Sequence, residues 1–356
     1  MHPQIDDLSP AQLRIDHQHI VSVTTKINQL RAEIATVIAG QTNVIDLVLM
    51  AMACRGHVLL EGVPGIAKTT LVKTLAQALG LNFKRIQFTP DLLPSDLIGT
   101  EIYNPKTQSF DIKYGPIFAN LVLADEINRA PAKVQSALLE CMQEQQVTIG
   151  NQSFQLSAPF LVFATQNPIE QAGTYLLPEA QLDRFLFKVL VDYPAPEVEK
   201  QILRRSQQPH PIQQIFTQAE IITLQQLVDL VYVDDKIVDY IVRLVQSTRL
   251  TSASHRTDPS QQSAVTTNRA KAKPSLRLSL AELIAVGASP RATLAIYHSA
   301  KAQALFQQRQ FVIPDDVKAV APACLRHRIA RSYTAQAQQI SADQIVANLL
   351  EMVPTP

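Results

Sequence analysis

The first two hundred residues alternate short apolar runs with longer segments that have helical spacing. Apolar residues recur at helical spacing over 28–38, 44–53 and 71–79, which predicts three helices. Five apolar runs predict strands, at residues 57–60, 83–88, 121–124, 160–164 and 187–191. Strands that alternate with helical segments favour a mostly parallel sheet with helices on both faces. Such a sheet binds its ligand at the carboxyl ends of its strands.

Two segments between these strands predict β-hairpins. In 101–113, Ile102 and Tyr103 face Phe110 and Ile112 across an Asn-Pro-Lys-Thr turn, and 147–156 turns at Gly150-Asn151. We expect both hairpins to be moving parts.

The strand signals stop after Pro194, and segments such as 223–230 and 237–250 predict an all-helical second domain. Residues 251–273 are rich in Ser, Thr, Gln and Ala and lack aromatic residues, so we expect a disordered surface insertion there. The predicted divisions of the chain are an N-terminal segment at 1–24, an α/β core at 25–193 and a helical lid at 194–356.

Composition excludes several classes of function. The 32 basic and 31 acidic residues leave a net charge of +1, which provides no broad attraction to nucleic acid or to anionic membranes. The three cysteines, Cys54, Cys141 and Cys324, are far apart and form no C-x-x-C pair, so neither a disulfide framework nor a zinc site is expected. The chain shows no signal peptide and no apolar run of membrane-spanning length, and we therefore expect a cytoplasmic protein.

A phosphate-binding loop is predicted between the first strand and the helix that follows it. Its residues are Gly62, Val63, Pro64, Gly65, Ile66, Ala67, Lys68, Thr69 and Thr70. In such a loop the backbone N–H groups hold phosphate oxygens, the lysine neutralises the β and γ phosphates, and the threonine hydroxyl binds Mg²⁺. Ala67 replaces the usual second glycine, so the alternative to a phosphate loop is an ordinary Gly-Pro turn before a helix.

An acid pair follows the apolar strand at 121–124. Asp125 can hold Mg²⁺ through water, and Glu126 can activate the attacking water as a general base. Adjacent acids at a strand end also serve as ordinary charges at a helix N-terminus. The preceding phosphate loop favours the catalytic interpretation.

Three further polar residues are candidates for the same site. Asn167 ends the fourth strand, where its amide could position water, although a polar residue before proline is also an ordinary turn former. Arg184 precedes the fifth strand. Arg291 follows Ser289-Pro290, a good helix start. For either arginine alone, a surface ion pair with a neighbouring acid is the ordinary explanation.

The chain resembles the MoxR family of AAA+ ATPases over most of residues 25–330. The resemblance is carried by the phosphate loop, Gly-Pro-Ile-Phe at 115–118, Ala-Asp-Glu-Ile-Asn-Arg-Ala-Pro at 124–131, and the runs at 88–96, 143–144, 164–168, 177–185, 287–292 and 314–329. Members of this family commonly have alanine before the loop lysine. The insertion at 251–273 is where relatives look shorter.

The resemblance implies a P-loop fold with a five-stranded parallel sheet between helices, followed by the helical lid. It implies ATP and Mg²⁺ as cofactors, Asp125 and Glu126 as the Walker B pair, Asn167 as sensor 1 and Arg291 as sensor 2. Arg184 would be the finger that reaches a neighbour's ATP, so the site would be shared within a ring, expected to be a hexamer. The two hairpins match inserts of this branch and would move with the nucleotide state.

The leading functional hypothesis is an ATP-driven chaperone that remodels or matures partner proteins. By resemblance, the partner often carries a von Willebrand factor A domain. A nucleic-acid motor or loader of the same branch is the alternative. The sequence evidence for it is limited to Lys106 and Lys113 in the first hairpin. A scaffold that uses nucleotide only as a structural switch is the third. The sequence does not name the client.

Overall fold

The computed structural model describes residues 17–63, 65–66, 68–167, 174–206, 211–249 and 280–356. Most of the predicted N-terminal segment, Pro64, Ala67 and the predicted insertion at 251–273 therefore lie outside the described residues. The chain forms two compact units, Met1–Tyr232 with Lys301–Phe311, and Val233–Ala300 with Val312–Pro356. The boundary at 193/194 stays a prediction from composition.

A five-stranded parallel sheet forms the centre of the first unit, in the order β2-β5-β8-β1-β9. All five predicted strands are present, with ends that differ by at most two residues from the prediction. They are β1 (Val58–Glu61), β2 (Phe83–Gln87), β5 (Leu121–Asp125), β8 (Leu161–Gln166) and β9 (Phe187–Leu190). Strand β5, next to the edge, is buried throughout, whereas the edge strand β2 has one buried position, Ile86, and exposes Arg85 and Gln87. Polar side chains on β2 are therefore free to reach the neighbouring strand.

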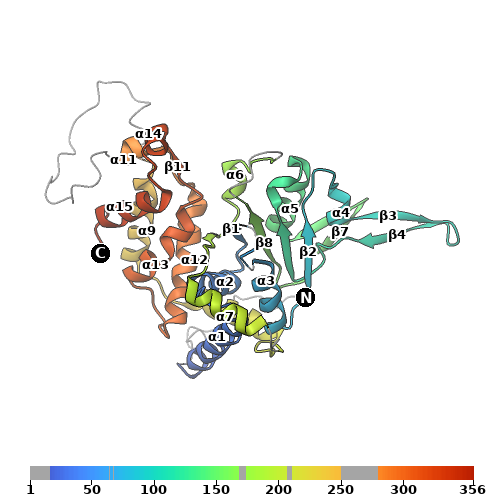
Figure 1. Ribbon diagram of the computed structural model, residues 1–356, viewed down its shortest axis with the longest axis horizontal. Coiled ribbons are helices and arrows are strands. Elements are labelled where there is room, and N and C mark those ends of the chain that lie inside the picture. The colour runs from blue at the N-terminus through green and yellow to red at the C-terminus, as the bar shows by residue number, and fades with distance from the viewer. Residues whose placement is uncertain (1–16, 64, 67, 168–173, 207–210, 250–279) are drawn as a thin grey trace. The chain divides into compact units, whose positions relative to one another are not determined.

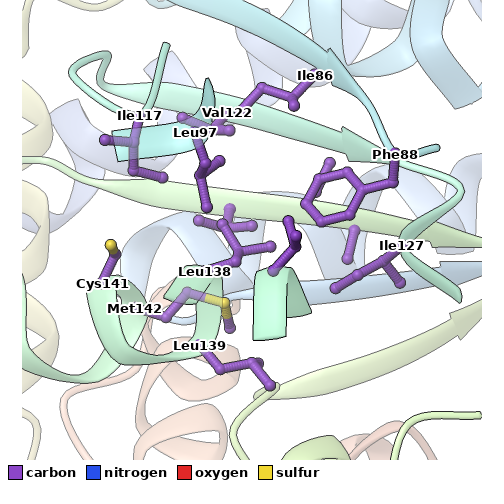
Figure 2. Close-up of a cluster of buried hydrophobic side chains, with 14 of the residues drawn as sticks. Ile86, Phe88, Leu97, Ile117, Val122, Ile127, Leu138, Leu139, Cys141 and Met142 are labelled. Carbon is purple, nitrogen blue, oxygen red and sulfur yellow. The ribbon is translucent and has the colours of Figure 1, made fainter. Parts of the chain in front are cut away.

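Helices of the first unit lie around this sheet, some against its strands and others against neighbouring helices (Figure 1). The longer ones are α1 (His17–Val37), α2 (Thr42–Ala53), α3 (Lys68–Ala78), α5 (Ala132–Glu144), α7 (Pro196–Ser206) and α8 (Gln218–Leu230). The short ones are α4 (Pro94–Ile98), the 3₁₀ turn η2 (Ile127–Arg129) and α6 (Glu179–Leu182). A buried apolar cluster joins α5 to the sheet, and it contains Leu138 and Met142 of the helix and Val122 of β5 (Figure 2). This core holds the strand ends and α5 as one packed body.

Both predicted hairpins are present. The first pairs β3 (Gly99–Asn104) with β4 (Ser109–Tyr114), and Tyr103 lies opposite Phe110 with ring centroids 5.4 Å apart. It projects away from the sheet in Figure 1. The second pairs β6 (Gln146–Ile149) with β7 (Gln152–Gln155), and Gly150 in its turn has a φ of 58°, a conformation that favours glycine. Movement of the hairpins with nucleotide stays a prediction.

The second unit is mostly helical. Its helices are α9 (Asp235–Ser247), α11 (Leu280–Leu283), α12 (Pro290–Phe306, whose last turns belong to the first unit), α13 (Pro314–Leu325), α14 (Tyr333–Ala337) and α15 (Ala342–Met352). The expectation of an all-helical lid missed one feature, an antiparallel ladder of β10 (Ile284–Val286) and β11 (Ala330–Arg331). Strands of three and two residues are too short to produce a period-two pattern. Among the described helices, none combines the length and apolar character of a membrane span.

Candidate functional site

The predicted phosphate loop connects β1 to α3, and its two glycines are required for different reasons. A Cβ on Gly62 would lie 2.4 Å from the carbonyl oxygen of Val191, so no side chain fits against β9. Gly65 has a φ of 84° and open space around it, so there the backbone conformation rather than crowding favours glycine. Helix α3 begins at Lys68, which directs the N–H groups of its first turn toward the loop.

Lys68 lies at the centre of this arrangement. Its Nζ donates to the carbonyl oxygen of Gly62 at 2.6 Å. Burial lowers the pKa of Lys68, and the negative charges of Asp125, Glu126 and Glu61 oppose this effect. The lysine therefore stands within the electrostatic reach of both predicted catalytic acids. Thr69 and Thr70 follow it in the first turn of α3.

Asp125 ends β5, and both of its carboxylate oxygens accept hydrogen bonds. The Thr165 hydroxyl on β8 donates to Oδ1 at 2.5 Å. Arg85 on β2 donates to Oδ2 through Nε at 2.9 Å and Nη2 at 2.6 Å. The neighbouring strands on both sides therefore fix the orientation of this carboxylate.

Glu126 directly follows the strand in a left-handed conformation, with φ 56° and ψ 49°. Its backbone N–H donates to the Thr165 hydroxyl at 2.8 Å. Its side-chain Oε2 accepts from Gln87 Nε2 at 2.7 Å and lies 3.1 Å from Arg129 Nε. Such a conformation is uncommon for a non-glycine residue and turns the chain sharply away from the sheet at this point.

Sequence reasoning missed Arg85, Gln87 and Thr165. Arg85 and Gln87 are two residues apart on β2, so they point to the same side, and each binds one acid of the pair. The available signal was the alternation of polar residues with buried Ile86 and Phe88 in a strand next to an acid-tipped strand. That signal has meaning only once β2 is known to lie beside β5.

Asn167 is buried and follows the end of β8. Because β8 pairs with β1 so that Gln166 lies opposite Glu61, Asn167 and Gly62 lie at the same edge of the sheet. The structure thus brings Lys68, Asp125, Glu126 and Asn167 together at the carboxyl ends of three adjacent strands.

A cavity of about 550 Å³ adjoins the phosphate loop. Gly65, Ile66 and Thr70 form one part of its lining. The other residues come from the α1–α2 connection, from the end of β9 and from α7: Val37, Ile38, Ala39, Gln41, Tyr193, Pro194, Glu199, Ile202 and Leu203. Its volume and largely apolar lining are those of a small-molecule site. The sequence offered no motif for these residues.

The two predicted arginines lie in different units. Arg184 is half-buried after α6, and its Nη1 donates to the carbonyl oxygen of Leu139 on α5 at 2.8 Å. Arg291 lies at the start of α12 in the second unit. Its N–H donates to the Ser289 hydroxyl at 3.0 Å, so the predicted helix cap is present. The Arg291 side chain is exposed on the second unit.

Comparisons with known proteins agree with this architecture. Residues 57–187 match the ATPase family associated with various cellular activities (AAA), and residues 278–349 match the AAA lid domain. The chain is 46% identical over 325 residues to chaperone MoxR1 of Mycobacterium tuberculosis, covering 91% of this chain and 81% of that protein. It is 44% identical to the uncharacterized protein YeaC of Bacillus subtilis, covering 90% and 92% of the two chains.

A solved structure extends the likeness to the fold. A crystal structure from Cytophaga hutchinsonii, named as a "putative ATPase", superposes with a TM-score of 0.82 at 43% identity and covers 95% of this chain and 97% of that one. Both units and their order along the chain are therefore shared with proteins of this kind. The chain belongs to the MoxR family of AAA+ ATPases.

Proposed function

We propose that this protein hydrolyses ATP to ADP and phosphate at the Lys68 loop and uses the energy to remodel or mature partner proteins. The convergence of Lys68, Asp125, Glu126 and Asn167 at one edge of the sheet carries the proposal. A nucleotide would place its phosphates on the loop and its base in the adjoining cavity. The cavity volume of about 550 Å³ suits a nucleoside.

The residues present fit both cofactors. The Gly62 N–H donates to the carbonyl oxygen of Gln166 at 3.3 Å, whereas helix α3 begins at Lys68, so the N–H groups of its first turn are the donors that a phosphate would meet at the end of the loop. The Thr69 hydroxyl and the Asp125 carboxylate are hard oxygen donors of the kind that Mg²⁺ prefers. Bound Mg²⁺ would neutralise charge on the phosphates.

The protein side chains divide the remaining work. Lys68 would compensate phosphate charge, and Glu126 would take the proton of the attacking water. Asn167 would orient that water. Gln87 and Arg129 both bind Glu126 Oε2, so one of its carboxylate oxygens is held while Oε1 remains for water.

Two arginines would complete the site. We propose that Arg184 reaches the nucleotide of a neighbouring subunit and that Arg291 acts as sensor 2 on the nucleotide. An arginine supplied in trans stabilises transition-state charge and can be worth roughly a thousandfold in rate. The active form would then be a ring, with six subunits expected from the family resemblance. Isolated subunits would hydrolyse ATP slowly.

The experiment that tests this function replaces the proposed base. Glu126→Gln should keep binding of a fluorescent ATP analogue and lose at least about a hundredfold in phosphate release, since general-base catalysis contributes about that much. Exposed Glu140 on α5 offers a matched Glu→Gln control that should leave turnover unchanged. Full turnover by the Glu126→Gln protein would show that the base is assigned wrongly.

The same variant can be used to identify the client protein. Glu126→Gln protein held with ATP should retain its protein partner, for which a von Willebrand factor A domain protein is the expectation from resemblance. Single-stranded DNA should leave hydrolysis unchanged, because a net charge of +1 provides no extended phosphate-binding surface. A several-fold, salt-sensitive stimulation by DNA would contradict the chaperone function and favour a nucleic-acid motor.

A further inference from the structure

Helix α5 contacts two functional segments through one side chain. Gln135 Nε2 donates to the carbonyl oxygens of Ile127 and Tyr175, both at 3.1 Å. Tyr175 N–H in turn donates to the carbonyl oxygen of Asn128 at 2.6 Å. Ile127 directly follows Glu126. The amide of Gln135 therefore ties the turn behind the catalytic acid to the segment that begins at Tyr175.

Burial makes the Gln135 amide depend on these two hydrogen bonds, since its Oε1 is also buried and has no hydrogen-bond partner among the described residues. Its side chain is 0% exposed, so its two N–H groups have no access to bulk water and depend on these carbonyls. A buried donor without a partner costs about 1–3 kcal/mol. Any state of the protein that moves the 127–128 turn away from Tyr175 must therefore find new partners for this amide.

The same helix holds the proposed trans-acting arginine. Leu139 is four residues after Gln135 and so lies on the same face of α5, where its carbonyl oxygen accepts from Arg184 Nη1 at 2.8 Å. Leu177 and Phe185 are both buried in the cluster that contains Leu138 and Leu139. The segment from Tyr175 to Phe185 is thus attached to α5 and its core at both ends.

Helix α5 is packed firmly enough to transmit a displacement. Leu138, Leu139, Cys141 and Met142 all enter the apolar cluster against the sheet (Figure 2). Close-packed interiors shift between discrete arrangements rather than deform continuously. A rearrangement of the 127–128 turn when nucleotide is hydrolysed would therefore move α5 and Arg184 with it.

We propose that Gln135 is a positioning residue that couples the acids of one nucleotide site to the Arg184 that the same subunit supplies to the next site. The proposal rests on the shared site described under the proposed function. Gln135 itself touches neither nucleotide. Its loss should weaken hydrolysis in a neighbouring subunit whose own Gln135 is intact.

A mixing experiment separates this effect from local damage. Arg184→Ala subunits keep their acids but supply no arginine, and Glu126→Gln subunits supply the arginine but cannot hydrolyse. A mixture of the two should regain phosphate release at the sites of the Arg184→Ala subunits. The Glu126→Gln partner then carries either Gln135→Met, which keeps length and helix propensity without the donor, or Gln143→Met, the same change at an exposed position of α5.

The Gln143→Met partner should rescue as well as Glu126→Gln alone, and the Gln135→Met partner should rescue roughly tenfold less or worse. An error of about 1 Å in the position of a catalytic group can cost a hundredfold. Equal rescue by both partners overturns the coupling role of Gln135. Failure of Glu126→Gln alone to rescue refutes the shared site instead.

Folding of the variant is checked independently. The Gln135→Met protein should bind the fluorescent ATP analogue as tightly as the Glu126→Gln protein and assemble to the same size. If methionine at 135 prevents folding, Gln135→Asn takes its place in the same mixture. Asparagine keeps a polar group at this buried position but is one methylene too short to reach both carbonyls, so the same loss of rescue is expected.

Discussion

A buried histidine, at the end of β1 opposite to the phosphate loop, should make the protein sensitive to mild acid. His57 immediately precedes β1, and its Nδ1 accepts a hydrogen bond from the Val162 N–H of β8 at 3.0 Å. The proton of the neutral ring is therefore on Nε2, which lies 3.1 Å from the carbonyl oxygen of Met142. A second proton on Nδ1 would face the N–H of Val162. The folded protein therefore accommodates His57 only in its neutral form.

The size of the effect follows from the pKa. Burial lowers the pKa of His57 from 6.5 to about 4, and the hydrogen bond to Met142 opposes this only in part. Between these two values the unfolded chain binds a proton that the folded chain does not, so the free energy of unfolding falls as the pH falls. Each pKa unit between the unfolded and the folded value corresponds to about 1.4 kcal/mol of unfolding free energy, so the whole difference is worth about 3 kcal/mol. Between pH 7 and pH 5 the loss should be about 2 kcal/mol.

Urea unfolding at pH 7, 6 and 5 measures this loss. The chain has no tryptophan, so far-UV circular dichroism is the suitable signal. With a urea dependence of about 3 kcal/mol per molar, the midpoint should fall by about 0.6 M more in the wild type than in His57→Gln. Glutamine offers one donor and one acceptor at this position and does not titrate.

The control is the same substitution at an exposed histidine. His19→Gln should preserve the wild-type dependence on pH, because the His19 side chain is exposed in α1. If His57→Gln loses as much stability between pH 7 and pH 5 as the wild type, then burial of a neutral His57 is not the source of the acid sensitivity.

Three further predictions concern the nucleotide site. Gly62→Ala should weaken binding of a fluorescent ATP analogue by roughly tenfold or more, because its Cβ would meet the Val191 carbonyl at 2.4 Å. Gly65→Ala has room for its Cβ and carries only the strain of a φ of 84°, so it should lose less, and the reverse order would contradict the crowding argument. Arg85→Met should lower kcat by about tenfold, because Asp125 loses two charge-assisted hydrogen bonds. Lys84→Met, at an exposed position of the same strand, is the control, and equal kcat in the two variants would refute the role of Arg85. Tyr193→Ala should raise the Kd of the ATP analogue roughly tenfold, because it removes an aromatic side chain from the cavity lining. Tyr103→Ala on the first hairpin should leave this Kd unchanged. An unchanged Kd in Tyr193→Ala would show that the adenine base binds elsewhere.

Features that depend on neighbouring residues along the chain were accessible from the sequence. The apolar runs of β5 and β8 marked these strands, because a strand that is buried on both faces must be apolar along its length, whereas the edge strand β2 has a single buried position, Ile86. The phosphate loop, the Asp125-Glu126 pair and both hairpin turns are also local patterns. Helix α1 is the partial exception, because it begins at His17, eleven residues before its apolar spacing becomes regular at Asn28.

Features that depend on contacts between distant segments were decided only by the tertiary structure. Arg85 and Gln87 reach the acid pair because β2 lies beside β5, and no local pattern specifies the strand order β2-β5-β8-β1-β9. Tyr193 and Gln41 line one cavity although 152 positions separate them (193 minus 41). A glutamine in the middle of a helix has no distinctive signal, and Gln135 acquires its role only when α5 packs between the 127–128 turn and Tyr175. The sequence by itself therefore determined the parts of the proposed nucleotide site that are short and contiguous. The connections between those parts required the folded chain, because they are formed by single side chains that long-range packing brings together.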